Sequence, residues 1–359
     1  MAGNSFGYSF KIMTFGESHG KCVGVVIDGC PSGLELDLGK VQAELNRRRP
    51  GQSAVTTPRN ERDRIKVYSG LFKGKTTGTP LGFMISNENV DSGSYENISD
   101  KFRPGHADYT YWKKYGIRDW RGGGRASARE TAARVMAGAV AKQVLEKYSG
   151  IQIFGATVCV GGIEAKARDY KYSESNILRC PDSEVYELMM DRVRKARLAK
   201  DSIGGAVEVV AKHVPAGLGE PVFDKLNAVL MHALGSIGAV KAVGIGKGRE
   251  VENMLGSEYQ DQKVWVGKEM CYFSNNAGGM EGGISNGEDV VARLSVKPTP
   301  TRAGVKMTLP DEKYKNEDVI IKGRHDPIIM PRLVPVAEAM MAATLVDFLI
   351  RQKAYTFRG

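Results

Sequence analysis

The order of strand-like and helix-like segments is the feature that most limits what this chain can fold into. Residues 9–15 and 21–27 are rich in β-branched and aromatic side chains, a helix pattern follows Asp37, and residues 64–85 return to short strand patterns. Later strands and helices follow in mixed order, without regular alternation of the two. Because a doubly wound parallel sheet requires that alternation, the order favours a layered α/β fold.

Capping residues and helix-breaking residues mark the ends of the expected helices. Asp37 is an expected N-cap, and Pro50-Gly51 stops that helix just after three consecutive arginines. Residues 127–130 match a capping box, so a helix is expected to run to about Lys147. The other expected elements are a polar surface loop at 88–103, strands at 151–159 and 205–214, helices at 183–198 and 222–234, and a terminal helix with one apolar face at 331–352.

Cysteine usage and hydropathy indicate a cytoplasmic protein. The five cysteines form no C-x-x-C pair, so they predict neither a zinc site nor a disulfide framework, and we expect no metal. The first fifteen residues have no apolar core behind a basic start. No stretch approaches the ~20 apolar residues that span a bilayer, so no membrane association is expected.

The charge balance indicates an anionic partner. Lys and Arg total 51 against 41 Asp and Glu, a formal net charge of +10. Nucleic acid would be attracted by that charge, but the basic residues are scattered and no familiar nucleic-acid module is present. A nucleic-acid-binding protein is therefore kept only as an alternative, and an acidic small molecule bound by a few arginines is the preferred interpretation.

Three segments resemble known catalytic motifs but lack the required context. Residues 16–20 fit the G-x-S-x-G nucleophile elbow, yet a strand pattern follows where the elbow needs a helix. Residues 69–76 lack the first glycine and the helix of a P-loop, and Arg249 replaces the third glycine of a dinucleotide fingerprint. A serine hydrolase built on Ser18 remains the alternative from another enzyme class.

A glycine loop ahead of a helix is the strongest candidate anion site. Residues 122–124 are three glycines, and Arg125 and Arg129 follow four residues apart, so that both would share one helix face. Free N–H groups and the helix dipole favour phosphate or carboxylate at such a position. The alternative is an ordinary helix start with surface arginines.

Histidines in turns supply candidates for proton transfer. His19, His106 and His325 each lie beside Gly, Pro or charged residues and outside apolar patterns, and histidine suits proton transfer near neutral pH. Residues 323–327 place a cation, an imidazole and a carboxylate in one turn, and residues 297–301 add a cation with two hydroxyls. Each could instead be a solvated turn. Together they indicate an enzyme for an acidic ligand, and they leave the reaction open.

Six motifs in order resemble those of the chorismate synthase family. They are F-G-E-S-H-G at 15–20, R-R-R-P-G at 47–51, R-P-G-H-A-D at 103–108, R-G-G-G-R-A-S-A-R-E-T at 121–131, G-G-I-S-N-G at 282–287 and G-R-H-D-P at 323–327. The resemblance implies a single domain over 1–359, a β-α-β sandwich with helices packed between antiparallel sheets, and a homotetramer. It also implies reduced FMN as cofactor and elimination of phosphate from 5-enolpyruvylshikimate 3-phosphate. A separate flavin reductase is the default expectation, and self-reduction with NADPH is left open.

The resemblance also assigns roles to individual residues of this chain. His19 would protonate the departing phosphate, His106 would lie by flavin N1, and Asp326 would help to deprotonate flavin N5. The substrate's anionic groups would be bound by Arg48, Arg129 and Arg324. The expected FMN contacts are Arg125, Ala126, Ser127, Gly238, Ala239, Gly282, Lys297, Pro298, Thr299, Pro300, Thr301 and Arg324.

Three positions depart from the family pattern. Ala54 stands where a second substrate-binding arginine is common, with Arg59 as a candidate replacement. Gly238 replaces an asparagine at the expected flavin site. Glu281 brings a carboxylate close to that site, which would be unfavourable beside a flavin phosphate unless it points away.

Overall fold

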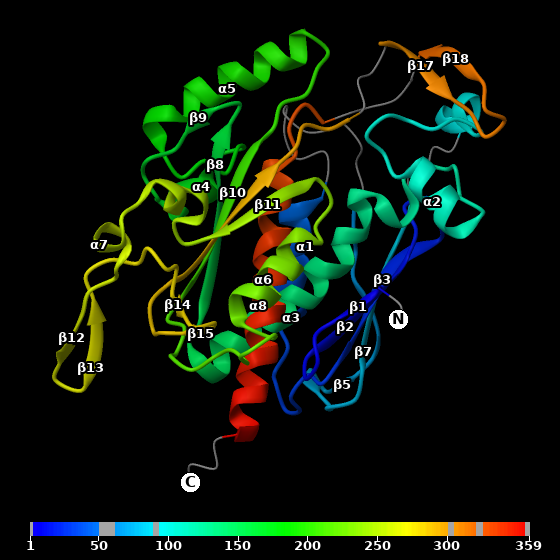
Figure 1. The fold of residues 1–359 in the computed structure, drawn as a ribbon. Helices are drawn as coiled ribbons and strands as arrows, with labels where there is room; N and C mark the ends of the chain where they lie inside the picture. Colours follow the sequence, from blue (N-terminus) through cyan, green and yellow to red (C-terminus); the bar gives the residue numbers. More distant parts are fainter. Residues whose placement is uncertain (1–2, 50–61, 89–92, 301–304, 321–325, 356–359) are drawn as a thin grey trace.

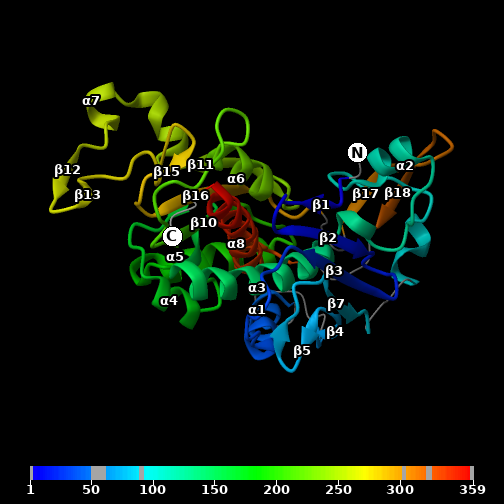
Figure 2. The ribbon, with the colours of Figure 1, turned by 90° about the horizontal axis from the view of Figure 1, so that it is seen from below.

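Two antiparallel sheets enclose a layer of helices. The computed structural model describes residues 3–49, 62–88, 93–300, 305–320 and 326–355. Figures 1 and 2 show the helix layer between the sheets from two directions. The first sheet has the order β1-β2-β3-β7-β4, formed by β1 (Ser5–Phe6), β2 (Lys11–Gly16), β3 (Cys22–Asp28), β7 (Leu81–Ser86) and β4 (Lys66–Ser69). The second has the order β11-β16-β10-β8-β9, formed by β11 (Val240–Ile245), β16 (Val290–Val296), β10 (Gly205–Lys212), β8 (Gln152–Val160) and β9 (Ile163–Glu164).

The remaining elements fill the central layer or decorate the outside. Central helices are α1 (Leu38–Arg48), α3 (Thr131–Ser149), α6 (Leu226–Gly235) and α8 (Met330–Tyr355). Outer helices are α2 (Asp108–Tyr115), α4 (Tyr170–Ser175), α5 (Ser183–Leu198) and α7 (Gly256–Tyr259). Small hairpins pair β5 (Leu71–Phe72) with β6 (Lys75–Thr76), β12 (Lys263–Val266) with β13 (Glu269–Tyr272), β14 (Met280–Glu281) with β15 (Ile284–Ser285), and β17 (Lys306–Pro310) with β18 (Asn316–Ile320). The layered α/β fold and the β-α-β sandwich are thus confirmed.

Local signals predicted several element boundaries well. The hairpin of β2 and β3 closes around the turn after Gly16, which pairs with Val23. The Asp37 carboxylate caps α1 by accepting hydrogen bonds from the N–H groups of Gly39 and Lys40. The helix expected at 183–198 is α5 with the same bounds. These features depend on neighbours within a few residues, and this is why the sequence pattern reveals them.

Three expectations need correction. The segment expected as a surface loop at 88–103 contains a 3₁₀ turn at Gly93–Ile98, and Ile98 and Phe102 are buried. The helix expected from residue 222 begins only at Leu226. The capping box is half formed, because the Ser127 hydroxyl accepts from the Arg129 N–H while the Glu130 side chain accepts from Thr14 and Arg134. For the capping box, a long-range contact with Thr14 prevails over the local pattern.

Helix α8 is buried on all sides, where the sequence suggested one apolar face. From Met330 to Leu349 every residue except Arg332 is buried, because α8 lies between the sheets and against α3. Gly138 of α3 has no space for a Cβ, which would collide with Ala339, so the two helices cross closely. By length and composition α8 could cross a membrane, but 94% of its most apolar window is buried inside the protein, as expected of a core helix.

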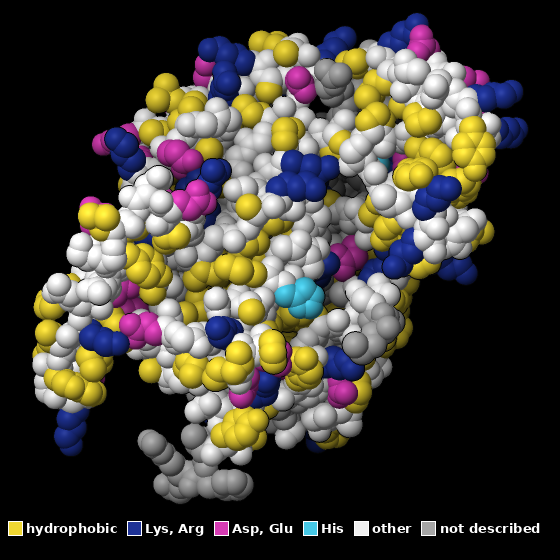
Figure 3. Space-filling model, viewed as in Figure 1, with side chains coloured by type: hydrophobic (Ala, Val, Ile, Leu, Met, Phe, Trp, Pro, Cys, Tyr) yellow, Lys and Arg dark blue, Asp and Glu magenta, His cyan; other side chains and the backbone are white. Residues whose placement is uncertain are grey.

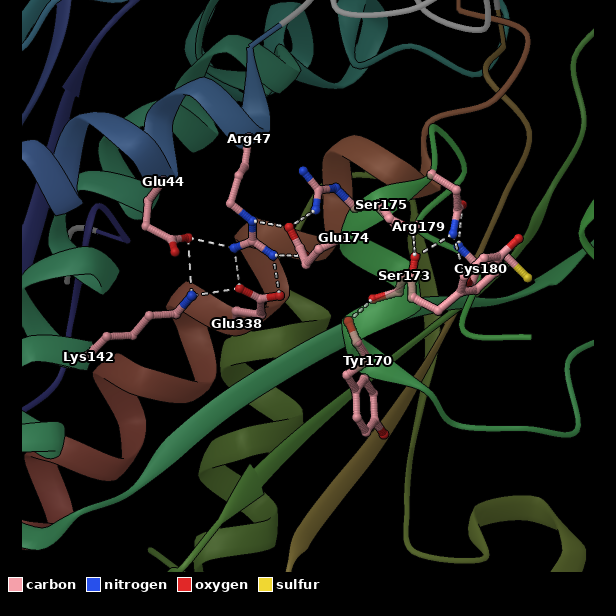
Figure 4. A network of polar contacts seen from close by, with 12 residues as sticks. Glu44, Arg47, Lys142, Tyr170, Ser173, Glu174, Ser175, Arg179, Cys180 and Glu338 are labelled. Atoms are coloured by element: carbon pink, nitrogen blue, oxygen red, sulfur yellow. Dashed lines mark hydrogen bonds and ion pairs between the residues drawn. The ribbon is translucent and has the colours of Figure 1, made fainter. Parts of the chain in front are cut away.

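A buried ion network joins α8 to three other helices (Figure 4). The Glu338 carboxylate, 1% exposed, accepts from Arg47 of α1 at 2.6 and 2.8 Å and from Lys142 of α3 at 2.6 Å. Arg47 also donates to Glu174 of α4 at 2.6 Å. Burial alone would raise the pKa of Glu338, but the charges of Lys142 and Arg47 outweigh it and hold the pKa at about 2. The network therefore anchors the C-terminal end of α1.

Replacing Glu338 with glutamine is expected to destabilise the fold by about 1.5–3 kcal/mol at pH 7, since the partly buried Arg47 and Lys142 lose their shared buried carboxylate and keep only Glu44 and Glu174 as charged partners. The pKa of Glu338 is lower in the folded protein than its unfolded value of about 4.3. Its ion pairs therefore stabilise the fold fully above that pH, and this stabilisation is lost as the pH falls towards about 2. Urea unfolding should therefore show a gap between wild type and Glu338→Gln that is constant near neutrality and closes below about pH 4. Glu146→Gln, which breaks an exposed pair with Lys40, is the control and should cost under about 1 kcal/mol. A gap independent of pH would contradict this account.

Candidate functional site

A cavity of about 690 Å³ opens where the first sheet meets the central helices. Lys and Arg side chains and a histidine border the hollow on the face drawn in Figure 3. One wall is apolar and is formed by Ile12, Ile237, Ile329, Leu333, Val336 and Met340. The lining also carries cations and hydroxyls from separate loops. A cavity that combines apolar side chains with charged groups suits a ligand with an apolar ring system and anionic substituents.

The glycine loop before α3 shapes one end of the cavity. Gly122 has a φ of +67°, and a Cβ there would collide with the His19 ring, so only glycine allows this approach. Arg125, whose backbone turn lines the cavity with Ala126 and Ser127, donates to Thr14 Oγ1 at 2.7 Å and to Gly16 O at 3.1 Å. Its side chain therefore ties the loop to β2. The segment that the sequence singled out therefore lines the cavity, and the contacts of Arg125 also give it a structural role.

His19 lies at the rim of the cavity. Its Nδ1 is 3.0 Å from the hydroxyl of Ser18, and its ring meets the edge of Tyr95, a cavity-lining residue, at 5.3 Å between centroids. The Arg103 guanidinium lies over the Tyr95 ring, 5.5 Å from its centroid. The Ser18–His19 pair could suggest a nucleophile, but Ser18 is 1% exposed and its turn joins two strands. The nucleophile elbow is thus not formed.

The R-P-G-H-A-D segment holds His106 against the cavity through its first and last residues. Arg103 donates to the Asp108 carboxylate through Nε and Nη2, both at 2.8 Å, and to Gly122 O at 2.8 Å. Burial would raise the pKa of Asp108, but hydrogen bonds from Arg103 outweigh it and keep the pKa low. The ion pair and the Gly122 contact join both ends of the segment to the glycine loop, and His106 between them lines the cavity.

An arginine cluster forms the most strongly cationic part of the site. Arg48, which lines the cavity, donates to Asp63 at 2.8 Å, and Arg129 pairs with the other oxygen of the same carboxylate. Burial lowers the pKa of Arg48 to about 10. The charges of Arg332 and Arg129 add to this lowering, and the Asp63 carboxylate opposes it. Among the described residues Arg48 Nε has no hydrogen-bond partner. A bound anion would satisfy that donor and favour the charged guanidinium.

Arg129 lies behind Arg48 and does not line the cavity. It is 5% exposed and donates to Asn87 Oδ1 at 2.9 Å besides its pair with Asp63. The sequence placed Arg125 and Arg129 on one helix face, but both fall in successive 3₁₀ turns before α3. The two side chains consequently point to different partners, and Arg129 supports the position of Arg48.

The expected flavin contacts from the second half of the chain largely converge on the cavity. Gly238, Ala239, Lys297, Thr299 and Pro300 all line it. Lys297 Nζ donates to Gly105 O at 2.9 Å, which joins this loop to the one that carries His106. Burial lowers the pKa of Lys297, and the nearby charge of Lys241 lowers it further. An anion beside Lys297 would offset both effects.

Other predicted residues lie elsewhere. Pro298 packs against Gly204, and Gly282 lies in the β14–β15 turn, whose Gly283 carbonyl accepts from Leu226 at the start of α6. The cavity lies at the opposite end of α6, so Gly282 does not line it. Glu281 points away as required, because it accepts from Lys263 at 3.0 Å and from Tyr272 at 3.1 Å. Outside the described residues lie Ala54, Arg59, Thr301, Arg324 and His325.

Several residues of the site belong to no sequence motif. Asp63 has a φ of +43° and binds two arginines, although it lies in a charged stretch with no motif. Arg332 lines the cavity and donates to Asp326 Oδ2 at 2.6 Å. His232 lines it from α6. Only Arg332 carried a usable signal, since it is the one charged residue in the otherwise apolar stretch 328–337.

The fold and the cavity define a class of protein: a β-α-β sandwich whose cavity is lined by arginines, a lysine, histidines and apolar side chains. The sequence matches the family described as "Chorismate synthase" over residues 10–350. A chorismate synthase of Methanococcoides burtonii is 55% identical over 355 residues, which cover 98% of this chain and 97% of that protein. One of Roseiflexus castenholzii is 49% identical over 354 residues and 98% of both chains.

A solved structure agrees with these relatives. The crystal structure of a chorismate synthase matches with a TM-score of 0.77 and 31% identity, and it covers 96% of this chain and 93% of its own. The chain belongs to the chorismate synthase family, enzymes of the shikimate pathway that leads to aromatic amino acids.

Proposed function

We propose that the protein catalyses the 1,4-anti elimination of phosphate from 5-enolpyruvylshikimate 3-phosphate to give chorismate, with reduced FMN. The observation that carries the proposal is the buried Arg48 beside the cavity, with an unsatisfied Nε and a lowered pKa. Such a guanidinium favours a ligand that brings negative charge into a desolvated site. A substrate with one phosphate and two carboxylates meets that requirement.

The residues present fit a flavin. The apolar wall that includes Ile12, Ile329 and Leu333 can take the ring system, while Lys297 supplies a cation for the phosphate. Gly238 has open space where a side chain would lie, so the asparagine usual in the family is replaced here by room for a ligand or water. When bound, reduced flavin supplies the electron density that lets phosphate leave C3 before the hydrogen leaves C6.

The protein's own residues then bind, orient and move protons. Arg48 would hold one anionic group of the substrate, with Arg324 as a second contact. His19 would donate a proton to the departing phosphate oxygen, which avoids releasing a fully charged anion inside the cavity. His106 would govern the charge near flavin N1, and Asp326 would help to remove the proton at N5. Arg129 would affect substrate binding indirectly, because it shares the Asp63 carboxylate with Arg48.

We further propose that the single domain 1–359 assembles as a homotetramer in the cytoplasm and receives reduced flavin from a separate reductase. One apolar core extends through both sheets and the central helices, which supports a single domain. Val264, Trp265 and Val266 are exposed on the β12–β13 hairpin, which stands away from the body in Figures 1 and 2. Exposed apolar side chains of this kind suit a subunit interface.

An anaerobic assay with reduced FMN and 5-enolpyruvylshikimate 3-phosphate tests the proposed function. Chorismate is expected to form over many turnovers while the flavin remains reduced, because the elimination is redox-neutral overall. Oxidised FMN should give no product under the same conditions. Absence of chorismate, or oxidation of one flavin per product under strict anaerobiosis, would overturn the proposal.

A further inference from the structure

Arg332 is the only residue of α8 between Met330 and Leu349 that is not buried. Its guanidinium makes two directed hydrogen bonds to different elements of the cavity. Nη1 donates to Asp326 Oδ2 at 2.6 Å, and Nε donates to the backbone carbonyl of Arg48 at 3.2 Å. All three residues line the cavity. One side chain therefore connects the turn before α8 with the end of α1.

The position of Arg332 is unfavourable for helix stability. It is the third residue of α8, and a cation in the first turn of a helix opposes the helix dipole. It also lies close enough to Arg48 for its charge to help lower the pKa of that guanidinium. Among the residues that the structure describes, Arg48, Arg129 and Arg332 share two carboxylates, Asp63 and Asp326.

Helix α8 holds the end of α1 at two consecutive residues. Glu338 binds the side chain of Arg47, as Figure 4 shows, and Arg332 binds the carbonyl of Arg48. The first contact lies in the core and the second lies in the cavity wall. The direction in which the Arg48 side chain leaves the backbone is thus set from both sides.

We propose that Arg332 is a positioning residue that holds the Asp326 carboxylate and the Arg48 backbone at a fixed separation across the cavity. The inference rests on the proposed function, since it assigns Arg332 an effect on turnover through Asp326 and on substrate binding through Arg48. The two bonds need the planar fork of a guanidinium, because Nε and Nη1 donate in fixed and different directions. A lysine keeps the charge but has a single donor atom for both acceptors.

A double-mutant cycle with Asp326→Asn separates the two effects. Arg332→Met is expected to lower kcat about 10–100-fold and to raise KM for the substrate, as loss of a charge-assisted contact predicts. In the Asp326→Asn background, Arg332→Met should leave kcat within about twofold of the value for Asp326→Asn alone, because the carboxylate that Arg332 positions is absent. The rise in KM should persist. Arg332→Lys should recover part of kcat and little of KM.

Arg351 supplies the matched control. It lies on the same helix, is 17% exposed against 16% for Arg332, and pairs with Asp224 and Asp347 outside the cavity. Arg351→Met should lower thermal stability and leave kcat and KM of the folded enzyme unchanged. Wild-type enzyme without chorismate formation would overturn the proposed function and this inference together. An active wild type with multiplicative kcat losses in the cycle would overturn the inference alone.

Discussion

His19→Ala is expected to lower turnover by roughly 10²–10⁴, the range for loss of a general acid. The ring lies at the cavity rim, fixed by the Ser18 hydroxyl and the edge of Tyr95, so no other described histidine occupies the same place. The measurement is kcat for chorismate formation under anaerobic conditions with saturating reduced FMN. Flavin affinity should stay near the wild-type value, because His19 does not line the cavity wall.

His213→Ala serves as the control for this substitution. His213 is exposed and does not line the cavity, so kcat should not change. If His19→Ala keeps near-normal turnover, the assignment of proton donation to His19 is wrong. If both variants lose turnover equally, the loss comes from general destabilisation.

Arg48→Ala is expected to raise the substrate dissociation constant by at least 10–100-fold, because one charge-assisted contact contributes about 1.5–3 kcal/mol. The true effect should exceed this range if the substrate anion stays buried without a partner. FMN binding should change less, since Lys297 lies on the other loop. Titration of each ligand separately, by flavin fluorescence and by equilibrium dialysis of the substrate, measures the two constants.

Arg48→Ala is also expected to lower fold stability, because Arg48 is 1% exposed and donates to the Ala128 carbonyl, although Asp63 keeps its pair with Arg129. Arg168→Ala is the matched control, since Arg168 pairs with Glu208 outside the cavity and should not affect either ligand. Equal losses of affinity for FMN and substrate in Arg48→Ala would indicate a collapsed site and would refute the specific role of Arg48.

Most of the secondary structure could be predicted because its causes are local. The Asp37 cap, the β2–β3 hairpin and helix α5 each depend on residues within one or two turns of each other. Errors arose where distant residues compete for the same groups. Glu130, for example, binds Thr14, 116 residues away, and so does not complete the expected capping box.

In the candidate site too, some residues could be predicted from local motifs and others could not. Motifs identified the loops that carry His106, Ser127 and Lys297, and the structure brings these three loops to one cavity. Motifs did not identify Asp63 or Arg332, because an ion pair has no sequence period. The two arginines that bind Asp63 lie 15 and 66 residues away from it along the chain. The shared helix face expected for Arg125 and Arg129 is not formed, since two successive 3₁₀ turns carry these residues.

By itself the sequence determined the order of strands and helices, the mixed architecture, the family resemblance and which loops carry ligand-binding residue types. Only the tertiary structure decided that α8 is buried on every side, that Arg48 faces the cavity while Arg129 lies behind it, and that Arg332 joins Asp326 to α1. The physical reason is that hydrogen-bonding and side-chain periods act over a few residues, whereas burial and charge pairing depend on which distant surfaces meet when the two sheets close over the helices.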